Sequence, residues 1–233
     1  MARRCLQLLV VVVTASCSSE LERVPPAPDA SITTLEELPL AEQVEQVRRG
    51  ATDQIQIETR HVTDEQLAQL TGLTRLKELV LTDTDVSDAG VRHLAGLTSL
   101  TRLVLGETSL TDEGIEPLTK LANLESLNLA SCEITSAGFE RLTRLQKLWA
   151  LRLGRSRIDD SALACITQLP NLTQLILQNA PLTDAGLVQL EDCNDLTTLY
   201  LEGTEVTDEG VGRLKESLPH THVHWGAGHG HHE

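Results

Sequence analysis

The chain has 233 residues, of which 40% are hydrophobic but only 2% are aromatic. A core built almost entirely from Leu, Ile and Val indicates one small packing unit that is used many times. The formal net charge is −15 at pH 7. This charge argues against a nucleic-acid partner and against adsorption to an anionic membrane, because both need clustered Lys and Arg.

Residues 1–16 are predicted to form a secretory signal peptide. Arg3 and Arg4 give a positively charged start, and an apolar stretch follows over residues 6–13. This stretch is too short to span a bilayer and has the length of the hydrophobic region of a signal. The alternative is a cytosolic start with a buried strand over residues 8–13, but no segment after it continues the same periodic pattern.

The segment TASC at residues 14–17 resembles the bacterial lipobox, in which the cysteine is lipidated and becomes the mature N-terminus. The resemblance implies that Cys17 is a lipidation site and that the protein is lipid-anchored to a membrane of the bacterial cell envelope. Thr14 departs from the usual aliphatic residue of the motif. Ordinary cleavage to a secreted, soluble protein is therefore the alternative.

Two segments precede the main body of the chain. Residues 17–34 begin with the lipidated cysteine, contain three prolines and lack apolar periodicity, which predicts a semi-extended tether. Residues 35–51 are predicted to form an N-terminal capping helix, because Leu40, Val44 and Val47 recur at helical spacing.

Residues 52–219 repeat every 24 residues without insertion, giving seven units. We number the places within a unit from one to 24. Places four and six are aliphatic and alternate with polar residues, which is the period of a strand with one buried face. Place four holds Ile55, Leu79, Leu103, Leu127, Leu151, Leu175 and Leu199, and place six holds Ile57, Leu81, Leu105, Leu129, Leu153, Leu177 and Leu201.

The second half of each unit is predicted to be helical. Places twelve and thirteen usually hold Thr or Ser followed by Asp, which caps a helix start. Apolar residues then recur at places sixteen, nineteen and 22, which is helical spacing. Glycine at place fifteen is expected to let the turn approach its neighbour closely. Pro117 lies where the third helix should run, so that helix is expected to be short or bent.

The end of the chain is predicted to close the core. Val223 and Trp225 occupy places four and six of an incomplete eighth unit, so residues 220–225 are expected to form a closing strand. Residues 226–233 are expected to form a flexible tail rich in His and Gly.

The motif LxxLxL followed by Thr-Asp-x-Gly-Leu resembles the leucine-rich-repeat family, and the nearest variants are those of ribonuclease inhibitor, F-box proteins and many bacterial envelope proteins. The resemblance implies an α/β fold, a right-handed leucine-rich-repeat solenoid, or horseshoe, with a parallel sheet on the concave side and helices on the convex side. It also implies a protein-binding scaffold. No F-box precedes the repeats, so a ubiquitin-ligase adaptor role is not implied.

The sequence shows no enzyme motif of the GxSxG, HExxH, CxxCH or glycine-rich phosphate-loop type. We therefore expect a non-enzymatic protein without a cofactor. Cys132 and Cys193 occupy places that hold small or core residues in other units, and we expect buried structural thiols there.

The predicted binding surface is the concave face, to which places three, five and seven point by strand alternation. Apolar residues with one aromatic at place five, together with two arginines, favour a protein partner of unknown identity, bound by a monomer. The alternative is that place five merely favours β-branched residues. The candidate residues are Val80, Arg102, Val104, Arg152, Ile176 and Tyr200.

The histidine-rich end gives the alternative function, a metal-handling surface protein. Imidazole is a ligand for zinc, nickel or copper, and alternating histidines in an extended strand share one face. A soluble, flexible end is the simpler interpretation of the same segment. The candidate ligands are His220, His222, His224, His229, His231 and His232.

Overall fold

The computed structural model describes residues 38–57 and 62–226. The predicted signal peptide and tether, Cys17 within them, and residues 227–233 lie outside these ranges. The strands are β1 (Gln54–Ile57), β2 (Glu78–Leu81), β3 (Arg102–Val104), β4 (Ser126–Asn128), β5 (Ala150–Arg152), β6 (Gln174–Ile176), β7 (Thr198–Tyr200) and β8 (His222–His224). The α-helices are α1 (Leu40–Arg49), α2 (Asp64–Leu67), α3 (Asp88–Val91), α4 (Asp112–Leu118), α5 (Ser136–Leu142), α6 (Asp160–Leu163), α7 (Asp184–Val188) and α8 (Asp208–Ser217), with short 3₁₀ turns Ala68–Leu70, Arg92–Leu94 and Ile166–Gln168.

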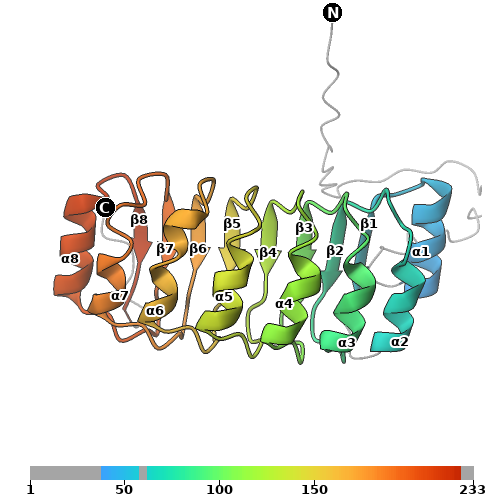
Figure 1. The fold of residues 1–233 in the computed structure, drawn as a ribbon, viewed down its shortest axis with the longest axis horizontal. Helices are drawn as coiled ribbons and strands as arrows, with labels where there is room; N and C mark the ends of the chain where they lie inside the picture. The colour runs from blue at the N-terminus through green and yellow to red at the C-terminus, as the bar shows by residue number, and fades with distance from the viewer. Residues whose placement is uncertain (1–37, 58–61, 227–233) are drawn as a thin grey trace, which may run out of the picture. The chain divides into compact units, whose positions relative to one another are not determined.

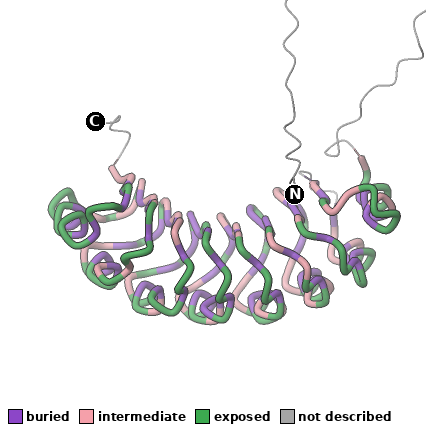
Figure 2. The backbone as a smooth tube through the Cα atoms, turned by 90° about the horizontal axis from the view of Figure 1, so that it is seen from above, coloured by how far each residue is buried: buried purple, intermediate pink, exposed green. Residues whose placement is uncertain are grey.

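The strands form a single parallel sheet in chain order, β1 to β8, across the described residues. The register equals the sequence period: Leu79 pairs with Leu103, and Leu103 with Leu127. The strands line the inner side of a curved solenoid and the helices line its outer side (Figures 1 and 2). The predicted α/β leucine-rich-repeat architecture, with the sheet on the concave side, is confirmed.

The core is the stacked interior between the sheet and the helices. The leucines of places four and six are almost fully buried, as at Leu103 and Leu105, and so are apolar residues on the helices, such as Leu118. Phe139 is fully buried among these aliphatic side chains. Burial of aliphatic surface contributes about 25 cal/mol per Å², so the repeated leucines carry most of the stability.

The junction between successive helices explains the Thr-Asp and glycine places. The Asp112 carboxylate accepts hydrogen bonds from the Thr135 backbone N–H (2.9 Å) and hydroxyl (2.5 Å). The same hydroxyl oxygen accepts from the N–H of Ala137 and so caps α5. A Cβ at Gly138 would overlap the Asp112 carboxylate, which confirms the expected close approach. Equivalent bonds join Asp64 to Ser87, Asp88 to Thr111, Asp160 to Thr183 and Asp184 to Thr207.

The helix of the third unit, α4, was expected to be short or bent, and it is not short. Helix α4 runs over seven residues with Pro117 inside it, as long as α5 and longer than α3. Pro117 falls in the last turn, so the helix loses one backbone hydrogen bond close to its end. Glu113, whose carbonyl would accept that bond, is exposed to solvent.

The C-terminal end of the solenoid is closed by β8 and the residue that follows it. Val223 is buried, and Trp225 packs against the core. The indole Nε1 of Trp225 donates to Asp208 (2.8 Å), and Lys215 Nζ lies 4.0 Å from the centre of the indole ring.

The helices of the described residues include none with the length and hydrophobicity that a membrane span requires.

Candidate protein-binding face

The concave face is formed by the strand residues that alternate with the core leucines. Place five of each strand lies beside place five of the next, as in the pairs Asn128–Arg152, Arg152–Ile176 and Ile176–Tyr200. Asn128, Arg152, Ile176 and Tyr200 are not buried, whereas the leucines that flank them belong to the core. The predicted candidates therefore share one continuous face of the sheet.

Two of the predicted apolar candidates are less accessible than expected. Val80 is 7% exposed and Val104 is 9% exposed. Each lies between two neighbouring strands, in register with Gln56 or Asn128 on its outer side. Side chains on adjacent strands stand only about 4.8 Å apart, so each short β-branched side chain lies close to the other valine on one side and to a longer side chain on the other.

The accessible apolar part of the face lies over β6 to β8. Ile176 and Tyr200 are half-buried. The Tyr200 ring stacks on the His224 imidazole with centroids 4.3 Å apart and planes 7° apart. Sequence reasoning treated His224 only as a metal ligand and missed this contact, although the shared place five of both residues could have predicted it.

The two predicted arginines have different surroundings. Arg102 is paired with Glu78 (Nε to Oε1, 2.9 Å), so its charge is partly neutralised. Arg152 is exposed, and within residues 38–57 and 62–226 it has no ion pair. Arg155, three residues later on the same coil, is likewise exposed and was not among the predicted candidates.

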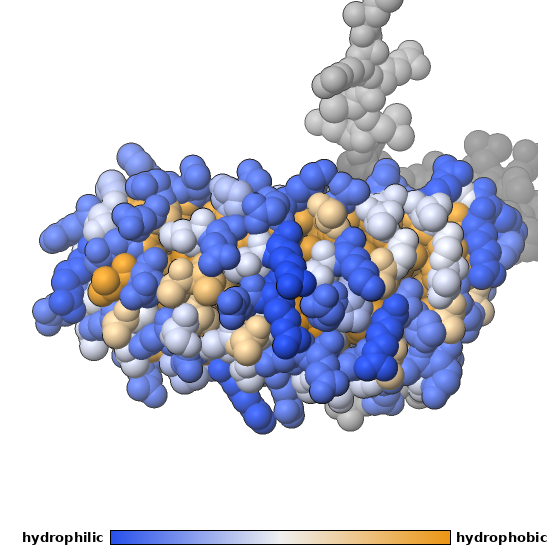
Figure 3. Space-filling view, viewed as in Figure 1, coloured by the Kyte–Doolittle hydropathy of each residue, from blue (hydrophilic) through white to orange (hydrophobic). Residues whose placement is uncertain are grey.

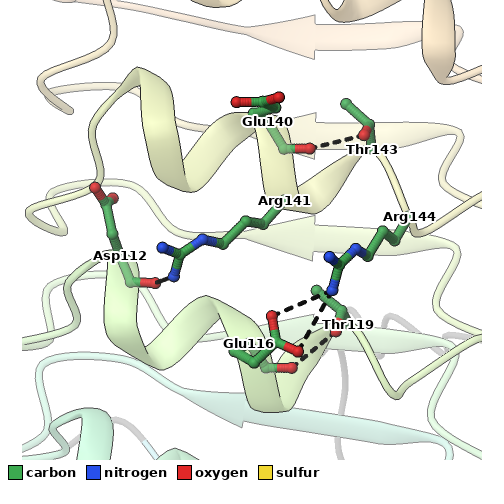
Figure 4. A network of polar contacts seen from close by, with 7 residues as sticks. All are labelled: Asp112, Glu116, Thr119, Glu140, Arg141, Thr143 and Arg144. Carbon is green, nitrogen blue, oxygen red and sulfur yellow. Dashed lines mark hydrogen bonds and ion pairs between the residues drawn. The ribbon is translucent and has the colours of Figure 1, made fainter.

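The convex face carries structural polar contacts. Arg141 of α5 donates to the backbone carbonyl of Asp112 (2.9 Å), and Arg144, two residues after the end of α5, pairs with Glu116 (3.2 Å), so both arginines link this coil to α4 (Figure 4). The helix side of the molecule is mostly hydrophilic (Figure 3). An exposed ion pair such as Arg144–Glu116 contributes about 0–1 kcal/mol.

The predicted metal ligands are only partly brought together. His222 and His224 lie on one face of β8, whereas His220 lies in the turn before it. His229, His231 and His232 lie outside the described residues. Among the residues that the structure describes, no group of three or more His, Cys, Asp or Glu side chains is placed to hold a metal ion.

The cysteines are packed as small apolar residues. Cys132 is buried, with its Sγ 3.4 Å from the Thr108 hydroxyl and 3.2 Å from the Leu105 carbonyl oxygen. Burial raises the pKa of the Cys132 thiol, and burial together with the nearby Asp192 raises the pKa of Cys193 to about 11. Both thiols are therefore protonated at neutral pH and are poor nucleophiles.

The comparisons with known proteins agree with this architecture. The family pattern described as Leucine Rich repeat matches residues 73–95, 96–118, 120–142 and 192–214. No curated protein matches the sequence. Among solved structures, internalin C2 of Listeria monocytogenes is 24% identical with a TM-score of 0.56, and the match covers 75% of this chain and 80% of that one.

Two further solved structures are similar over most of this chain. Internalin F of Listeria monocytogenes is 25% identical with a TM-score of 0.53, and a leucine-rich-repeat protein of Leptospira interrogans is 20% identical with a TM-score of 0.50. The matches cover 76% and 72% of this chain but only 54% and 46% of those proteins, so the chain spans about half their length. The repeat pattern, the register and the solenoid together show that this chain is a leucine-rich-repeat protein.

Proposed function

We propose that this protein is a non-enzymatic scaffold that binds a protein partner on the concave face of its sheet. The observation that carries the proposal is the contrast between the two faces. The concave face presents the half-buried Ile176 and Tyr200 beside the exposed Arg152, which has no ion pair with any described residue. The arginines Arg141 and Arg144 of the convex face instead bind a neighbouring coil. Aromatic, apolar and Arg side chains grouped in this way are typical of protein interfaces.

We further propose that the scaffold is held at a membrane of the bacterial cell envelope by lipid on Cys17. The support is the similarity of residues 14–17 to a lipobox, behind a positively charged and apolar start. An acidic body cannot adhere to anionic lipid by charge, so attachment would rest on the acyl chains.

The test is recovery of partners from bacterial envelope extract on the purified chain, compared among face variants. Tyr200→Ala and Ile176→Ala should each weaken binding by about fivefold or more and reduce recovery accordingly, because truncating a central interface side chain costs about 1 kcal/mol or more. Val188→Ala is the matched control, since Val188 is an apolar residue that is 56% exposed at the end of α7 on the convex side. Recovery that falls for Val188→Ala but not for the strand variants would place the partner on the helices.

The same experiment distinguishes the protein-binding scaffold from the alternative, a metal-handling surface protein. One arm deletes residues 227–233 only, because deleting from residue 220 would remove β8 with its buried Val223. A second arm adds a chelator. Recovery that survives both arms supports the scaffold, whereas loss in both supports a role for bound metal.

A further inference from the structure

The centre of the concave face lacks acidic residues. The three strand segments 126–131, 150–155 and 174–179 read SLNLAS, ALRLGR and QLILQN. They contain Arg152 and Arg155 and no Asp or Glu, in a chain that has 34 acidic residues. β4, β5 and β6 are neighbours in the sheet. The pairing continues past the strands, because the Ser131 N–H donates to the Gly154 carbonyl (2.8 Å) and the Arg155 N–H donates to the Gln178 carbonyl (2.7 Å). The three segments therefore form one surface, which we call the basic window.

The two arginines of the basic window have neutral neighbours on both sides. Arg152 lies in register between Asn128 and Ile176. Arg155 occupies the same place in its unit as Ser131 and Asn179 in the units beside it. Their guanidinium groups are therefore not neutralised by the next strand, unlike that of Arg102.

Acidic residues flank the basic window along the face. Glu78 and Asp83 in the second unit and Glu107 in the third lie on its N-terminal side, and Glu202 lies on its C-terminal side. Charges separated by more than about 8 Å are screened at physiological salt. An anionic group is therefore attracted by Arg152 and Arg155 only when it lies over the window, and the acidic residues repel it elsewhere on the face. A long nucleic-acid strand would extend into the acidic flanks, which favours a short anionic segment.

Apolar contact is available directly beside the arginines. Ile176 is one strand away from Arg152 and Tyr200 is two strands away, at about 4.8 Å per strand. Side chains on one side of an extended peptide are about 7 Å apart, and the Cα atoms of Arg152 and Arg155 are at most about 10 Å apart. Two carboxylates of one extended segment can therefore reach both guanidinium groups while an apolar neighbour lies against Ile176.

We infer that the concave face recognises an acidic peptide segment of its protein partner, in which two Asp or Glu carboxylates pair with Arg152 and Arg155 and an adjacent apolar side chain packs on Ile176 and Tyr200. This inference rests on the proposed binding function and specifies the chemistry of the partner. Arg–carboxylate pairs are directional and give specificity as well as affinity.

The experiment uses random peptides displayed on phage and selected against the purified full chain and against the Arg152→Gln/Arg155→Gln double variant. Wild type should enrich peptides with two closely spaced acidic residues beside an apolar one, and the double variant should not. A synthetic copy of the enriched peptide should bind the double variant about tenfold or more weakly, and should lose affinity as salt rises.

Arg157→Gln is the matched control, because Arg157 belongs to the same unit but is already paired with Glu133 (3.5 Å). Its peptide affinity should stay within about twofold of wild type. Thermal melting of each variant checks that the exposed substitutions leave the fold intact.

The outcomes separate this inference from the proposed function. Peptides that lose affinity with Ile176→Ala or Tyr200→Ala but not with the arginine variants would leave concave binding intact and overturn the acidic-segment inference. Peptides that are unaffected by all four substitutions, or the absence of any enriched peptide, would count against both. Equally tight binding of a short oligothymidylate strand would identify a general polyanion site and would also overturn the inference.

Discussion

The side-chain amide of Gln43 forms two hydrogen bonds with the backbone of Gln56, each 2.8 Å long. Its Nε2 donates to the Gln56 carbonyl oxygen, and its Oε1 accepts from the Gln56 N–H. Gln43 is fully buried on α1. The amide thus takes the place of a neighbouring strand beside β1 and satisfies part of an edge that would otherwise be open to pairing with another chain.

Replacing this amide should destabilise the first coil. Gln43→Leu removes the two hydrogen bonds to the partly buried backbone of Gln56, at about 1–3 kcal/mol each, so unfolding free energy should fall by roughly 2–6 kcal/mol. Denaturant unfolding measures the loss, and hydrogen exchange should show faster exchange of the Gln56 amide. The control Glu42→Gln, at an exposed position of α1, should stay within about 0.5 kcal/mol of wild type.

One helix junction differs from the others in three positions at once. Between α5 and α6, Ser136 stands in the aspartate place, Asp159 in the hydroxyl place and Ala162 in the glycine place. The hydrogen bond is reversed there, since the Ser136 hydroxyl donates to the Asp159 carboxylate (2.8 Å). Glycine is therefore needed only where the longer aspartate side chain lies against the next helix.

This relationship predicts a rescue at the α6–α7 junction. Gly186→Ala should destabilise the protein by roughly 1–3 kcal/mol, because its Cβ would overlap the Asp160 carboxylate. Adding Asp160→Ser and Thr183→Asp should recover most of that loss in thermal unfolding. Gly212→Ala on α8 meets no atom within 4 Å and should be neutral or stabilising. A triple variant no more stable than Gly186→Ala would refute the rescue.

Acid should destabilise the junction between α7 and α8. Hydrogen bonds to the Asp184 carboxylate, first from the Thr207 backbone N–H and then from the Thr207 hydroxyl, hold the pKa of Asp184 below its ordinary value. A carboxyl whose folded pKa is depressed stabilises the fold above its unfolded pKa of about 3.9, and that stability is lost as pH falls through the folded pKa. The difference in Tm between wild type and Asp184→Asn should therefore be constant above about pH 5 and shrink below about pH 4. A difference that grows on acidification would contradict this sign.

Core and face substitutions should have different effects on stability. Leu127→Ala removes a side chain that is 1% exposed and should cost roughly 2–5 kcal/mol of unfolding free energy. Tyr200→Ala, on the half-buried face residue, should cost less, since it loses mainly the stack on His224. Val104→Glu should also destabilise, because Val104 is only 9% exposed. Denaturant unfolding of the three variants ranks them, and a Tyr200→Ala loss as large as that of Leu127→Ala would mean that Tyr200 belongs to the core.

Membrane attachment should depend on Cys17. Several acyl chains hold a protein durably, whereas one alone holds it only marginally, so Cys17→Ser should move the protein to the soluble fraction, still folded. Fractionation and mass spectrometry of the N-terminal peptide measure this. An unmodified peptide that begins at a different cleavage site would show a secreted protein instead, and Thr14 would be the residue that departs from the motif.

Periodic features of the chain were predictable from the sequence. The 24-residue spacing became the register of the parallel sheet, and the leucines of places four and six became its buried side. The glycine at place fifteen marked a close approach. These inferences succeeded because the pattern is repeated, and each copy supports the same assignment.

Features of the binding face were less predictable. Side-chain alternation assigned Val80 and Val104 to the concave side, yet each is little exposed because it lies between the other valine and one longer residue, Gln56 or Asn128. The repeat pattern also gave no reason to separate Arg102, which pairs with Glu78, from Arg152, which does not. Arg155 was missed because its place in the unit follows the strand and carries no fixed side-chain type.

The sequence by itself therefore determined the fold class, the strand register and the core, because these follow from short-range periodicity and the burial of aliphatic side chains. Only the tertiary structure decided how the solenoid ends and which charges stay unpaired. Gln43 beside Gln56 and Trp225 beside Asp208 are contacts between residues 13 and 17 positions apart that occur once each. A repeat pattern cannot encode contacts that occur once, since they depend on where a non-repeating segment meets the first or the last coil.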